Sequence, residues 1–529
     1  MTTERHVVRA QAWLQAEPDD DVRAELAHLI AGPSSELAAR FDGRLQFGTA
    51  GLRGAIGAGP LRMNRLVVRQ AAAGLAQYVL AQWPDAAQRG IIIGFDARHK
   101  SDLFALDTAR VVAAVGVRAL LLPSPLPTPV LAWNITETNA IAGVMVTASH
   151  NPAIDNGYKV YLGDGAQIVS PHDAAIAACI DSFDPCNIDL ASVDHPLIER
   201  LDASAESRYL MAVPLVRLRP EVVGVPTAYT AMHGVGGATL LRAFEQSGLP
   251  KPHVVAAQQQ PDPTFPTVSF PNPEEPGAMD LLLELAATSG AMVALANDPD
   301  ADRLGAAIPT PSGGWRRLTG DELGWLLADH ILRHTSGTDR LVVTTLVSSS
   351  LLSRMANEHG IHFKETYTGF KWIGRTVLDH PELRFVFGYE QALGYLVCRQ
   401  PMDKDGISAA VLMAEVAALA ATDGVSLQDR LDALAARYGR HITAEQSVRL
   451  DPVAAARSVA ALRDRPPGQV ADRKVTNVEW FDEAGLLRVW LDGIRLQVRP
   501  SGTEPKVKLY GEAIDLDPAH YLSALSELL

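Results

Sequence analysis

IIIGFD, at residues 91–96, is an unbroken apolar run closed by an aspartate, which is the pattern of a strand buried on both faces of a sheet. Residues 103–118 follow with apolar side chains at helical spacing, and ALLL (119–122) predicts the next strand. AIAGVMV (140–146) predicts another buried strand. Because strands and helices alternate over short connections, we predict a mostly parallel sheet with helices on both faces.

The same alternation restarts twice further along the chain. TAYTAM (227–232) and AMVALA (291–296) predict strands of a second sheet, while LVVTTL (341–346) and RFVFG (384–388) predict strands of a third. In each case a segment with helical spacing lies between the two strands. The sequence therefore predicts three consecutive α/β units with mixed, mostly parallel sheets.

The C-terminal part has a different pattern, which is typical of a small antiparallel α+β domain. Its closely spaced, strand-like segments are VTNVEWF, LLRVWL, IRLQVR and KVKLYGEA, between helices predicted near 452–463 and 517–528. The predicted domains are α/β domains at 1–200, 201–310 and 311–437 and an α+β domain at 438–529. Each of the four contains one unusual loop that follows a predicted strand.

The composition excludes several classes of protein. The chain has 529 residues, 47% of them hydrophobic, so each of roughly three to four domains can bury a core and wholesale disorder is excluded. The net charge, 47 − 61 = −14, argues against non-specific nucleic-acid binding. Three cysteines are too few for a disulfide framework, and the N-terminus lacks the apolar run of a signal peptide. We therefore expect a cytoplasmic protein that binds neither nucleic acid nor membrane.

The first unusual loop, TASHNP (147–152), directly follows the predicted strand 140–146. A serine on a loop that leaves a buried strand can be held rigidly and still be exposed, at the sheet end where α/β proteins bind ligands. His150 and Lys159 could supply hydrogen-bond donors or a proton acceptor beside Ser149. The alternative is a plain Ser/Asn turn that ends at a proline.

The second loop, DPDADR (298–303), carries three carboxylates at alternating positions. In an extended or tightly curved loop Asp298, Asp300 and Asp302 point the same way, and such close like charges repel unless a cation lies among them. Oxygen ligands alone favour a hard cation, Mg²⁺ before Zn²⁺. The alternative is a solvated acidic turn, but the loop follows an apolar strand directly, so we predict a metal site.

Two further loops offer polar side chains after predicted strands. GYEQALG (388–394) has a lone Glu390 among glycines, which could either bind sugar hydroxyls or lie exposed in a turn. RPSGTEPK (499–506) combines Arg499 with hydroxyls and the backbone N–H groups around Gly502, a set that binds phosphate. The alternative is an ordinary hairpin loop, for which two prolines would be unusual.

Two glycine-rich segments do not fit nucleotide-binding patterns. FGTAGLRG (47–54) carries Arg53 but lacks the Walker spacing, and HGVGG (233–237) falls short of a dinucleotide fingerprint. The sequence therefore does not indicate a nucleotide cofactor.

Together the loops resemble the α-D-phosphohexomutase family, which includes phosphoglucomutases and phosphomannomutases. TASHNP, DPDADR, the Glu390 loop and RPSGTEPK occur in the family's order, and FGTAGLRG, NGYKV (156–160) and TGFKWI (368–373) match as well. The resemblance covers nearly the whole chain. It implies a heart-shaped protein of four domains with a central active-site cleft and a mobile C-terminal domain.

The resemblance also implies roles for individual residues. Ser149 would be the phosphoserine, and the implied catalytic group is Ser149, His150, Lys159 and Arg53. One Mg²⁺ per chain would be held by Ser149, Asp298, Asp300 and Asp302. The implied substrate-binding residues are Arg303, Gly369, Lys371, Glu390, Arg499, Ser501, Gly502 and Thr503.

The implied activity is intramolecular phosphate transfer between C1 and C6 of glucose, and also of mannose, through a sugar 1,6-bisphosphate that serves as intermediate and activator. The Glu390 loop departs from the hexose pattern, because Ala392 stands where serine is usual. A phosphopentomutase and a glucose-1,6-bisphosphate synthase therefore remain alternatives, and a non-catalytic sugar-phosphate sensor is a further one. The expected partner is a small phosphosugar, and the expected assembly is a monomer or homodimer.

Overall fold

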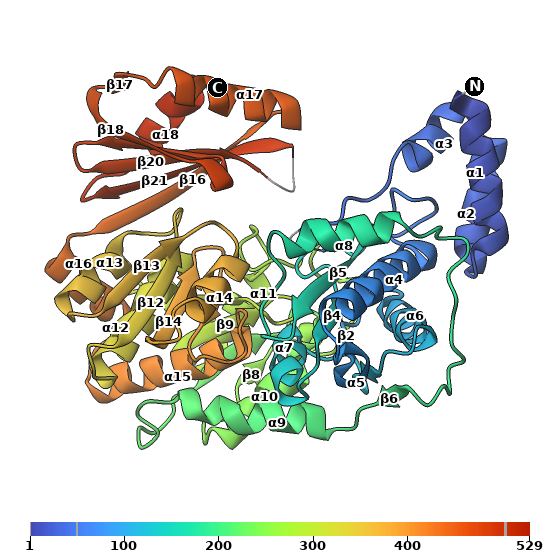
Figure 1. Ribbon diagram of the computed structural model, residues 1–529. Helices are drawn as coiled ribbons and strands as arrows, with labels where there is room; N and C mark the ends of the chain where they lie inside the picture. Colours follow the sequence, from blue (N-terminus) through green and yellow to red (C-terminus); the bar gives the residue numbers. More distant parts are fainter. Residues whose placement is uncertain (1, 49–50, 502–504) are drawn as a thin grey trace. The chain divides into compact units, whose positions relative to one another are not determined.

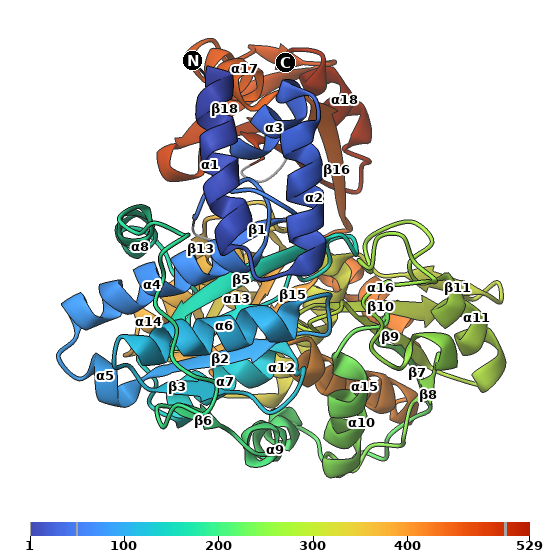
Figure 2. The same cartoon turned by 90° about the vertical axis from the view of Figure 1, so that its right-hand side faces the viewer.

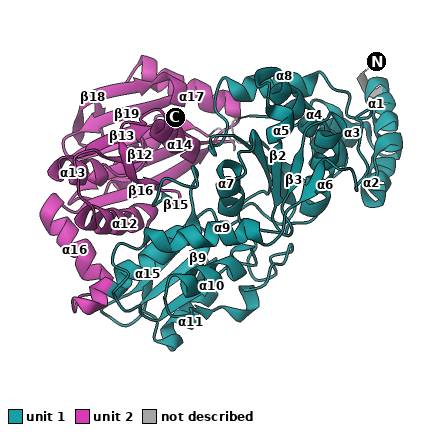
Figure 3. Cartoon of the chain, turned by 60° about the horizontal axis from the view of Figure 1, so that its bottom comes forward, with its two compact units in different colours: residues 1–317, 393–418 teal, residues 318–392, 419–529 magenta. Residues whose placement is uncertain are grey.

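The computed structural model describes residues 2–48, 51–501 and 505–529, which divide into two compact units (Figure 3). Unit 1 comprises Met1–Arg317 and Leu393–Ala418, and unit 2 comprises Leu318–Ala392 and Leu419–Leu529. The segment Leu393–Ala418 thus folds with the N-terminal part of the chain, although it follows the third group of strands in sequence.

The first part of unit 1 is an α/β domain whose centre is the run that begins at residue 91 (Figure 1). Its elements are α1 (Thr2–Ala16), α2 (Asp20–Ala31), α3 (Ser34–Phe41), β1 (Leu52–Ala55), α4 (Arg65–Gln82), α5 (Ala86–Arg89), β2 (Ile91–Phe95), α6 (Ser101–Ala114), β3 (Ala119–Leu121), α7 (Thr128–Glu137), β4 (Ala142–Val146), β5 (Asp155–Leu162), α8 (His172–Asp181) and β6 (Ile198–Arg200). The sheet order is β1-β5-β4-β2-β3-β6. Strands β2, β3, β4 and β6 are parallel, whereas β5 and β1 are added antiparallel.

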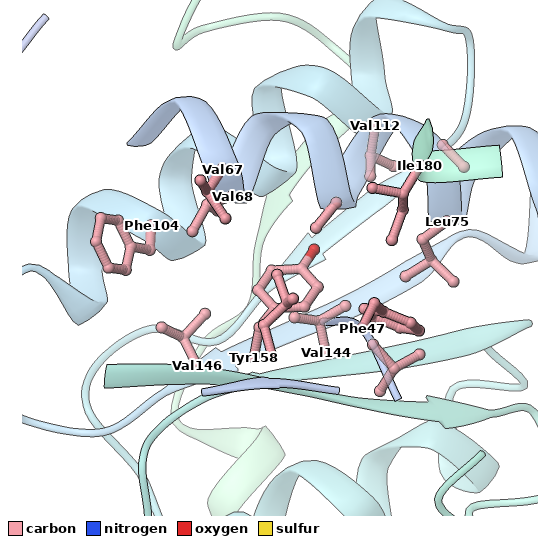
Figure 4. Close-up of a cluster of buried hydrophobic side chains, with 14 of the residues drawn as sticks. Phe47, Val67, Val68, Leu75, Phe104, Val112, Val144, Val146, Tyr158 and Ile180 are labelled. Atoms are coloured by element: carbon pink, nitrogen blue, oxygen red, sulfur yellow. The ribbon is translucent and has the colours of Figure 1, made fainter. Parts of the chain in front are cut away.

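The core of this domain follows from the alternation of side chains along its strands. Val144 and Val146 of β4 and Tyr158 of β5 lie on the face toward Val68 and Leu75 of α4 (Figure 4). On the opposite face glycines replace bulky residues, because helix α7 approaches the sheet closely. A side chain at Gly143 would come within 2.4 Å of Ile135 on α7.

Three helices precede the first strand and are absent from the sequence prediction. Helices α1 and α2 lie side by side, with α3 against them (Figure 2). Trp13 and Phe41 make an edge-to-face contact with ring centroids 5.7 Å apart. Lys100, which precedes α6, joins this group to the sheet domain through Asp19 at 2.8 Å.

The second part of unit 1 repeats the architecture around another mixed sheet. Its elements are α9 (Ser204–Ala212), η1 (Val213–Val216), β7 (Thr227–Thr230), α10 (Gly236–Gln246), β8 (His253–Val254), η2 (Ala256–Gln258), α11 (Asp280–Ser289), β9 (Val293–Asn297), β10 (Leu304–Pro309), β11 (Trp315–Arg317), β15 (Gly394–Leu396) and α15 (Gly406–Thr422), which ends beyond the unit. The sheet order is β11-β10-β9-β7-β8. Strands β7, β8 and β9 are parallel, and β10 returns antiparallel to β9.

Unit 2 combines a parallel sheet with an antiparallel one. Its elements are α12 (Gly320–His334), β12 (Arg340–Thr345), α13 (Leu351–Glu358), β13 (His362–Thr366), α14 (Phe370–Leu378), β14 (Arg384–Glu390), α16 (Leu427–Tyr438), β16 (His441–Arg449), α17 (Pro452–Asp464), β17 (Gln469–Val470), β18 (Arg473–Phe481), η3 (Asp482–Ala484), β19 (Leu486–Leu491), β20 (Ile494–Pro500), β21 (Lys506–Ile514) and α18 (Ala519–Ser526). Strand β12 lies between β13 and β14, all parallel. The antiparallel sheet has the order β16-β21-β20-β19-β18-β17.

The predicted fold class is confirmed: mixed or parallel sheets come first and an antiparallel sheet comes last. Among the described residues no single helix is long and apolar enough to cross a bilayer; the bent pair α15 and α16 meets that test only jointly, by length and composition.

Helices α4 and α8 pack closely against each other at Gly74. A β-carbon at Gly74 would lie 2.6 Å from the backbone nitrogen of Ile180, so Gly74→Ala must displace α8. Overpacking costs about 1–3 kcal/mol, which exceeds the ~1 kcal/mol that alanine gains in a helix. We expect a lower midpoint in thermal unfolding. The control Ala81→Gly, at an exposed position of α4, should lose only about 1 kcal/mol or less; a Gly74→Ala protein as stable as the parent would contradict this packing.

Candidate functional site

The serine loop after β4 is held in a strained conformation. Ser149 has a φ of 53°, unusual for a residue other than glycine, and is only 3% exposed. The buried Arg98 guanidinium donates to the carbonyl oxygens of Ser149 and Asn151, both at 2.6 Å. Asp96, which closes the apolar run of β2, pairs with Arg98 at 3.3 Å and accepts a hydrogen bond from Thr147 at 2.6 Å. The residues that end and follow β2 therefore fix the loop that follows the neighbouring strand β4.

The three aspartates after β9 form a compact, fully buried cluster. Oxygens of Asp298, Asp300 and Asp302 lie within 4.8 Å of one another, and each side chain is 0% exposed. Ser149 Oγ donates to Asp298 Oδ2 at 2.8 Å, so the serine and carboxylate loops meet inside unit 1. Asp298 Oδ1 accepts a hydrogen bond from the backbone N–H of Arg303.

Two lysines offset the negative charge of the cluster. Lys159 Nζ, on β5, contacts Asp300 Oδ2 at 2.6 Å and Asp302 Oδ2 at 2.7 Å. Lys404, just before α15, contacts Asp302 Oδ2 at 2.9 Å. Burial by itself lowers the pKa of Lys159, but the two carboxylates outweigh it and the net pKa is raised. Burial acts against ionisation of Asp302 as well, yet the lysines hold its pKa below the ordinary value.

The cluster also has donor atoms suited to a hard cation. Asp300 Oδ1 and Asp302 Oδ1 are buried and have no hydrogen-bond partner within the described part of the chain. Their Oδ2 atoms hold the lysines, and Thr128 Oγ1 donates to Asp300 Oδ2 at 2.6 Å. A buried carboxylate oxygen without a partner is costly, and a metal ion would relieve that cost. An all-oxygen set fits Mg²⁺.

The other predicted catalytic residues lie beside Ser149. His150 Nδ1 is 3.2 Å from Ser149 Oγ. Burial, with the neighbouring Arg303 and Arg53 charges, holds the pKa of His150 well below its usual value, so the ring is neutral at neutral pH. Arg53, on β1, donates to the Asn151 side chain at 3.0 Å.

The HGVGG segment after β7 supports the aspartate loop. The N–H of Val235 donates to the carbonyl of Pro299 at 2.8 Å, and a β-carbon at Gly234 would come within 2.3 Å of the Pro299 Cα. Ala301 in the supported loop has a φ of 56°, so this loop is strained like the serine loop. These glycines therefore allow the two backbones to approach closely.

The second set of predicted residues lies within unit 2. Gly369 N–H donates to Glu390 Oε1 at 3.1 Å, and Lys371 lies in the first turn of α14. Arg499 lies near the end of β20 and Ser501 comes directly after that strand, where its N–H donates to the Lys506 carbonyl at 2.9 Å. Gly502 and Thr503 lie outside the described residues. Each unit therefore groups its own share of the predicted site.

Sequence reasoning missed several residues that hold this site together. Lys404 lies in a short polar run, MDKDG (402–406), whose pattern alone did not distinguish it from a loop. Arg98, Asp96 and Thr128 follow or flank predicted strands, the same signal that identified the four loops, but no repeated charge or glycine pattern marked them.

The chain is similar to known proteins over most of its length. Four phosphoglucomutase/phosphomannomutase models match the chain: alpha/beta/alpha domains I, II and III at residues 44–185, 212–313 and 319–438, and the C-terminal domain at 451–523. A probable phosphomannomutase of Haemophilus influenzae is 42% identical over 476 residues, 88% of this chain and 96% of that protein. Human phosphopentomutase is 35% identical over 576 aligned residues, 98% of this chain and 93% of that protein.

The solved structures show the same fold. A putative phosphomannomutase from Thermus thermophilus matches with a TM-score of 0.73 at 23% identity, over 92% of this chain and 99% of that one. The family models match all four domains, and the two relatives are 42% and 35% identical to this chain over most of their length. This chain therefore belongs to the α-D-phosphohexomutases and is a phosphosugar mutase.

Proposed function

We propose that this enzyme interconverts glucose 1-phosphate and glucose 6-phosphate, and mannose phosphates as well, through a phosphoserine at Ser149 and a sugar 1,6-bisphosphate. The observation that carries the proposal is the 2.8 Å hydrogen bond between Ser149 Oγ and Asp298 Oδ2 within the buried carboxylate cluster. In this position, the hydroxyl that would accept the phosphate is hydrogen-bonded to a carboxylate that could hold a metal ion.

The residues of unit 1 supply what phosphoryl transfer needs, namely fixed placement and neutralised charge. Asp298, Asp300 and Asp302 would hold Mg²⁺, which when bound stabilises negative charge on the transferring group. Lys159, which contacts Asp300 and Asp302 at 2.6 and 2.7 Å, is a hydrogen-bond donor beside this cluster. Neutral His150, with Nδ1 3.2 Å from Ser149 Oγ, can hydrogen-bond to the serine hydroxyl.

The residues of unit 2 bind the rest of the substrate. Glu390, Gly369 and Lys371 contact sugar hydroxyls, while Arg499 and Ser501, with Gly502 and Thr503, bind the phosphate that does not react. Because the bisphosphate must turn around between the two half-reactions, either phosphate must fit the same group of donors. Binding energy at this distant phosphate then orients the reacting one.

A second candidate function is a phosphopentomutase. It is favoured by Ala392, which stands two residues after Glu390 where the hexose pattern has a serine hydroxyl, and by the human relative of that name, which matches 98% of this chain. A glucose-1,6-bisphosphate synthase differs in taking phosphate from an acyl-phosphate donor, so the supply of that donor separates it from both mutases.

The phosphoserine assignment predicts the loss of a covalent intermediate. Protein incubated with Mg²⁺, glucose 1-phosphate and trace glucose 1,6-bisphosphate should form glucose 6-phosphate and gain one phosphate by intact mass. Ser149→Ala should do neither while unfolding at nearly the same temperature. A protein that binds the bisphosphate but never gains mass would instead be a sensor.

The choice between hexose and pentose is decided by paired kinetics. We expect kcat/KM for glucose 1-phosphate to exceed that for ribose 1-phosphate, measured under the same Mg²⁺ and bisphosphate concentrations. The reverse order, with Ala392→Ser raising hexose use, would establish the pentomutase alternative. Product formation only with an acyl phosphate would establish the synthase.

The metal assignment predicts that Asp300→Asn impairs catalysis far more than folding. The substitution keeps side-chain volume but removes charge, and a metal supplies several kcal/mol of charge stabilisation, so kcat/KM should fall by at least about 10²-fold. The matched control is Asp107→Asn, also 0% exposed and paired with Arg65 and Arg69 at 2.7 and 2.8 Å. The Asp107→Asn variant should be less stable, but its folded molecules should keep the parent's activity and the dependence of that activity on Mg²⁺. Equal losses of activity in the two variants would refute the metal assignment.

A further inference from the structure

The strand that carries Arg499 is fixed to the parallel part of unit 2 by buried charged side chains. Arg495, also on β20, pairs with Glu512 of β21 at 2.7 Å, and these side chains are 4% and 5% exposed. Glu512 accepts a hydrogen bond from Ser349 Oγ at 2.6 Å, and Arg495 donates to the Ser348 carbonyl. Breaking such a buried network costs several kcal/mol, so β20 and β21 hold a set position on this part of the unit.

The same network reaches both segments proposed to bind the sugar. Ser348 Oγ donates to Gln391 Oε1 at 3.1 Å, next to Glu390. Arg488, on β19, pairs at 2.8 Å with Glu365, which lies on β13 just before the TGFKWI segment. The phosphate-binding strand and the sugar-binding loops are therefore tied together within one compact unit.

Tyr510 lies where these parts meet. Its side chain is 5% exposed and packs in a cluster with Leu346, Val347 and Leu486. Arg499 Nη2 donates to the Tyr510 hydroxyl at 3.1 Å, with the guanidinium carbon 5.8 Å from the ring centroid. Burial raises the pKa of Tyr510; Arg499 opposes the shift, while Glu445 and Glu390 add to it. The phenol thus stays neutral, and its ring packs against Leu346 and Val347, which directly precede Ser348.

The guanidinium of Arg499 has few other constraints. Its Nη1 donates to the carbonyl of the adjacent Pro500 at 3.3 Å, and its Nε has no partner in the described ranges, which omit residues 502–504. An arginine that binds phosphate in a bidentate manner needs a fixed plane. In this part of the chain, the hydroxyl that fixes the plane is that of Tyr510.

We propose that Tyr510 is a positioning residue, which orients Arg499 toward the non-reacting phosphate and holds it at a set distance from the sugar-binding loop. The inference rests on the proposed function. Because the orientation is built before the substrate arrives, it lowers the ordering cost of binding at this end of the molecule. Tyr510 acts through Arg499 and takes no part in the chemical step.

The test uses the full-length enzyme with Tyr510→Phe, which keeps the ring and removes the hydroxyl. We expect KM for the sugar phosphate to rise about 3- to 10-fold, the size of one hydrogen bond, with kcat changed less than about two-fold. Tyr521→Phe is the matched control, because Tyr521 is also 5% exposed and accepts from Arg473 Nε at 3.1 Å under a guanidinium 5.8 Å away. Tyr521→Phe should lower the stability of the protein by about as much as Tyr510→Phe does and should leave KM unchanged.

A double-mutant cycle separates positioning from a structural effect. In an Arg499→Ala background, Tyr510→Phe should leave KM unchanged, since there is no guanidinium to orient. An unchanged KM in the single Tyr510→Phe variant, an equal KM effect from Tyr521→Phe, or full additivity with Arg499→Ala would each overturn the inference.

Binding of glucose 1,6-bisphosphate to Ser149→Ala protein by calorimetry keeps this inference distinct from the proposed function. No binding by the Ser149→Ala protein would contradict the proposed function. Binding that Tyr510→Phe does not weaken would contradict only the role of Tyr510.

Discussion

Repulsion among three buried carboxylates is the constraint on which the rest of unit 1 depends. Two unit charges 4 Å apart interact by about 4 kcal/mol at an effective dielectric constant of 20, and here three oxygens lie within 4.8 Å. Lys159, on β5, and Lys404, just before α15, offset part of this repulsion. The antiparallel addition of β5 to β4 and the return of residues 393–418 to unit 1 therefore each bring a positive charge to the carboxylates.

Both loops that meet at Ser149 are held against their own backbone preferences. Ser149 and Ala301 have φ values of 53° and 56°, which cost about 1–2 kcal/mol each. Arg98 secures the first loop through carbonyl oxygens, and close approach at Gly234 secures the second. Strain of this kind persists only where the surroundings fix it, so the hydrogen bond from Ser149 to Asp298 is preorganised.

The sequence was sufficient for the parts of the fold with strong periodicity and insufficient where function alters the pattern. Buried strands such as β2 and β4 are continuous apolar runs, so the fold class could be predicted. Strand β5 is equally buried but contains Lys159 in DNGYKVYL, and a charged residue in a buried strand contradicts the pattern that identifies one. Lys404 escaped notice because its partner, Asp302, is about 100 residues away in sequence and only folding brings them together.

The two roles proposed for the site residues fall in different units. The residues proposed for chemistry gather in unit 1, whereas Glu390, Ala392 and Arg499 belong to unit 2. Within unit 1, the carbonyl of Leu393 accepts from the N–H of Leu304, and Gly394 bridges Arg303, so the start of the 393–418 segment is held beside the aspartate loop. Within unit 2, the buried contacts of β20 and β21 fix the strand that carries Arg499, the residue proposed to bind the distant phosphate.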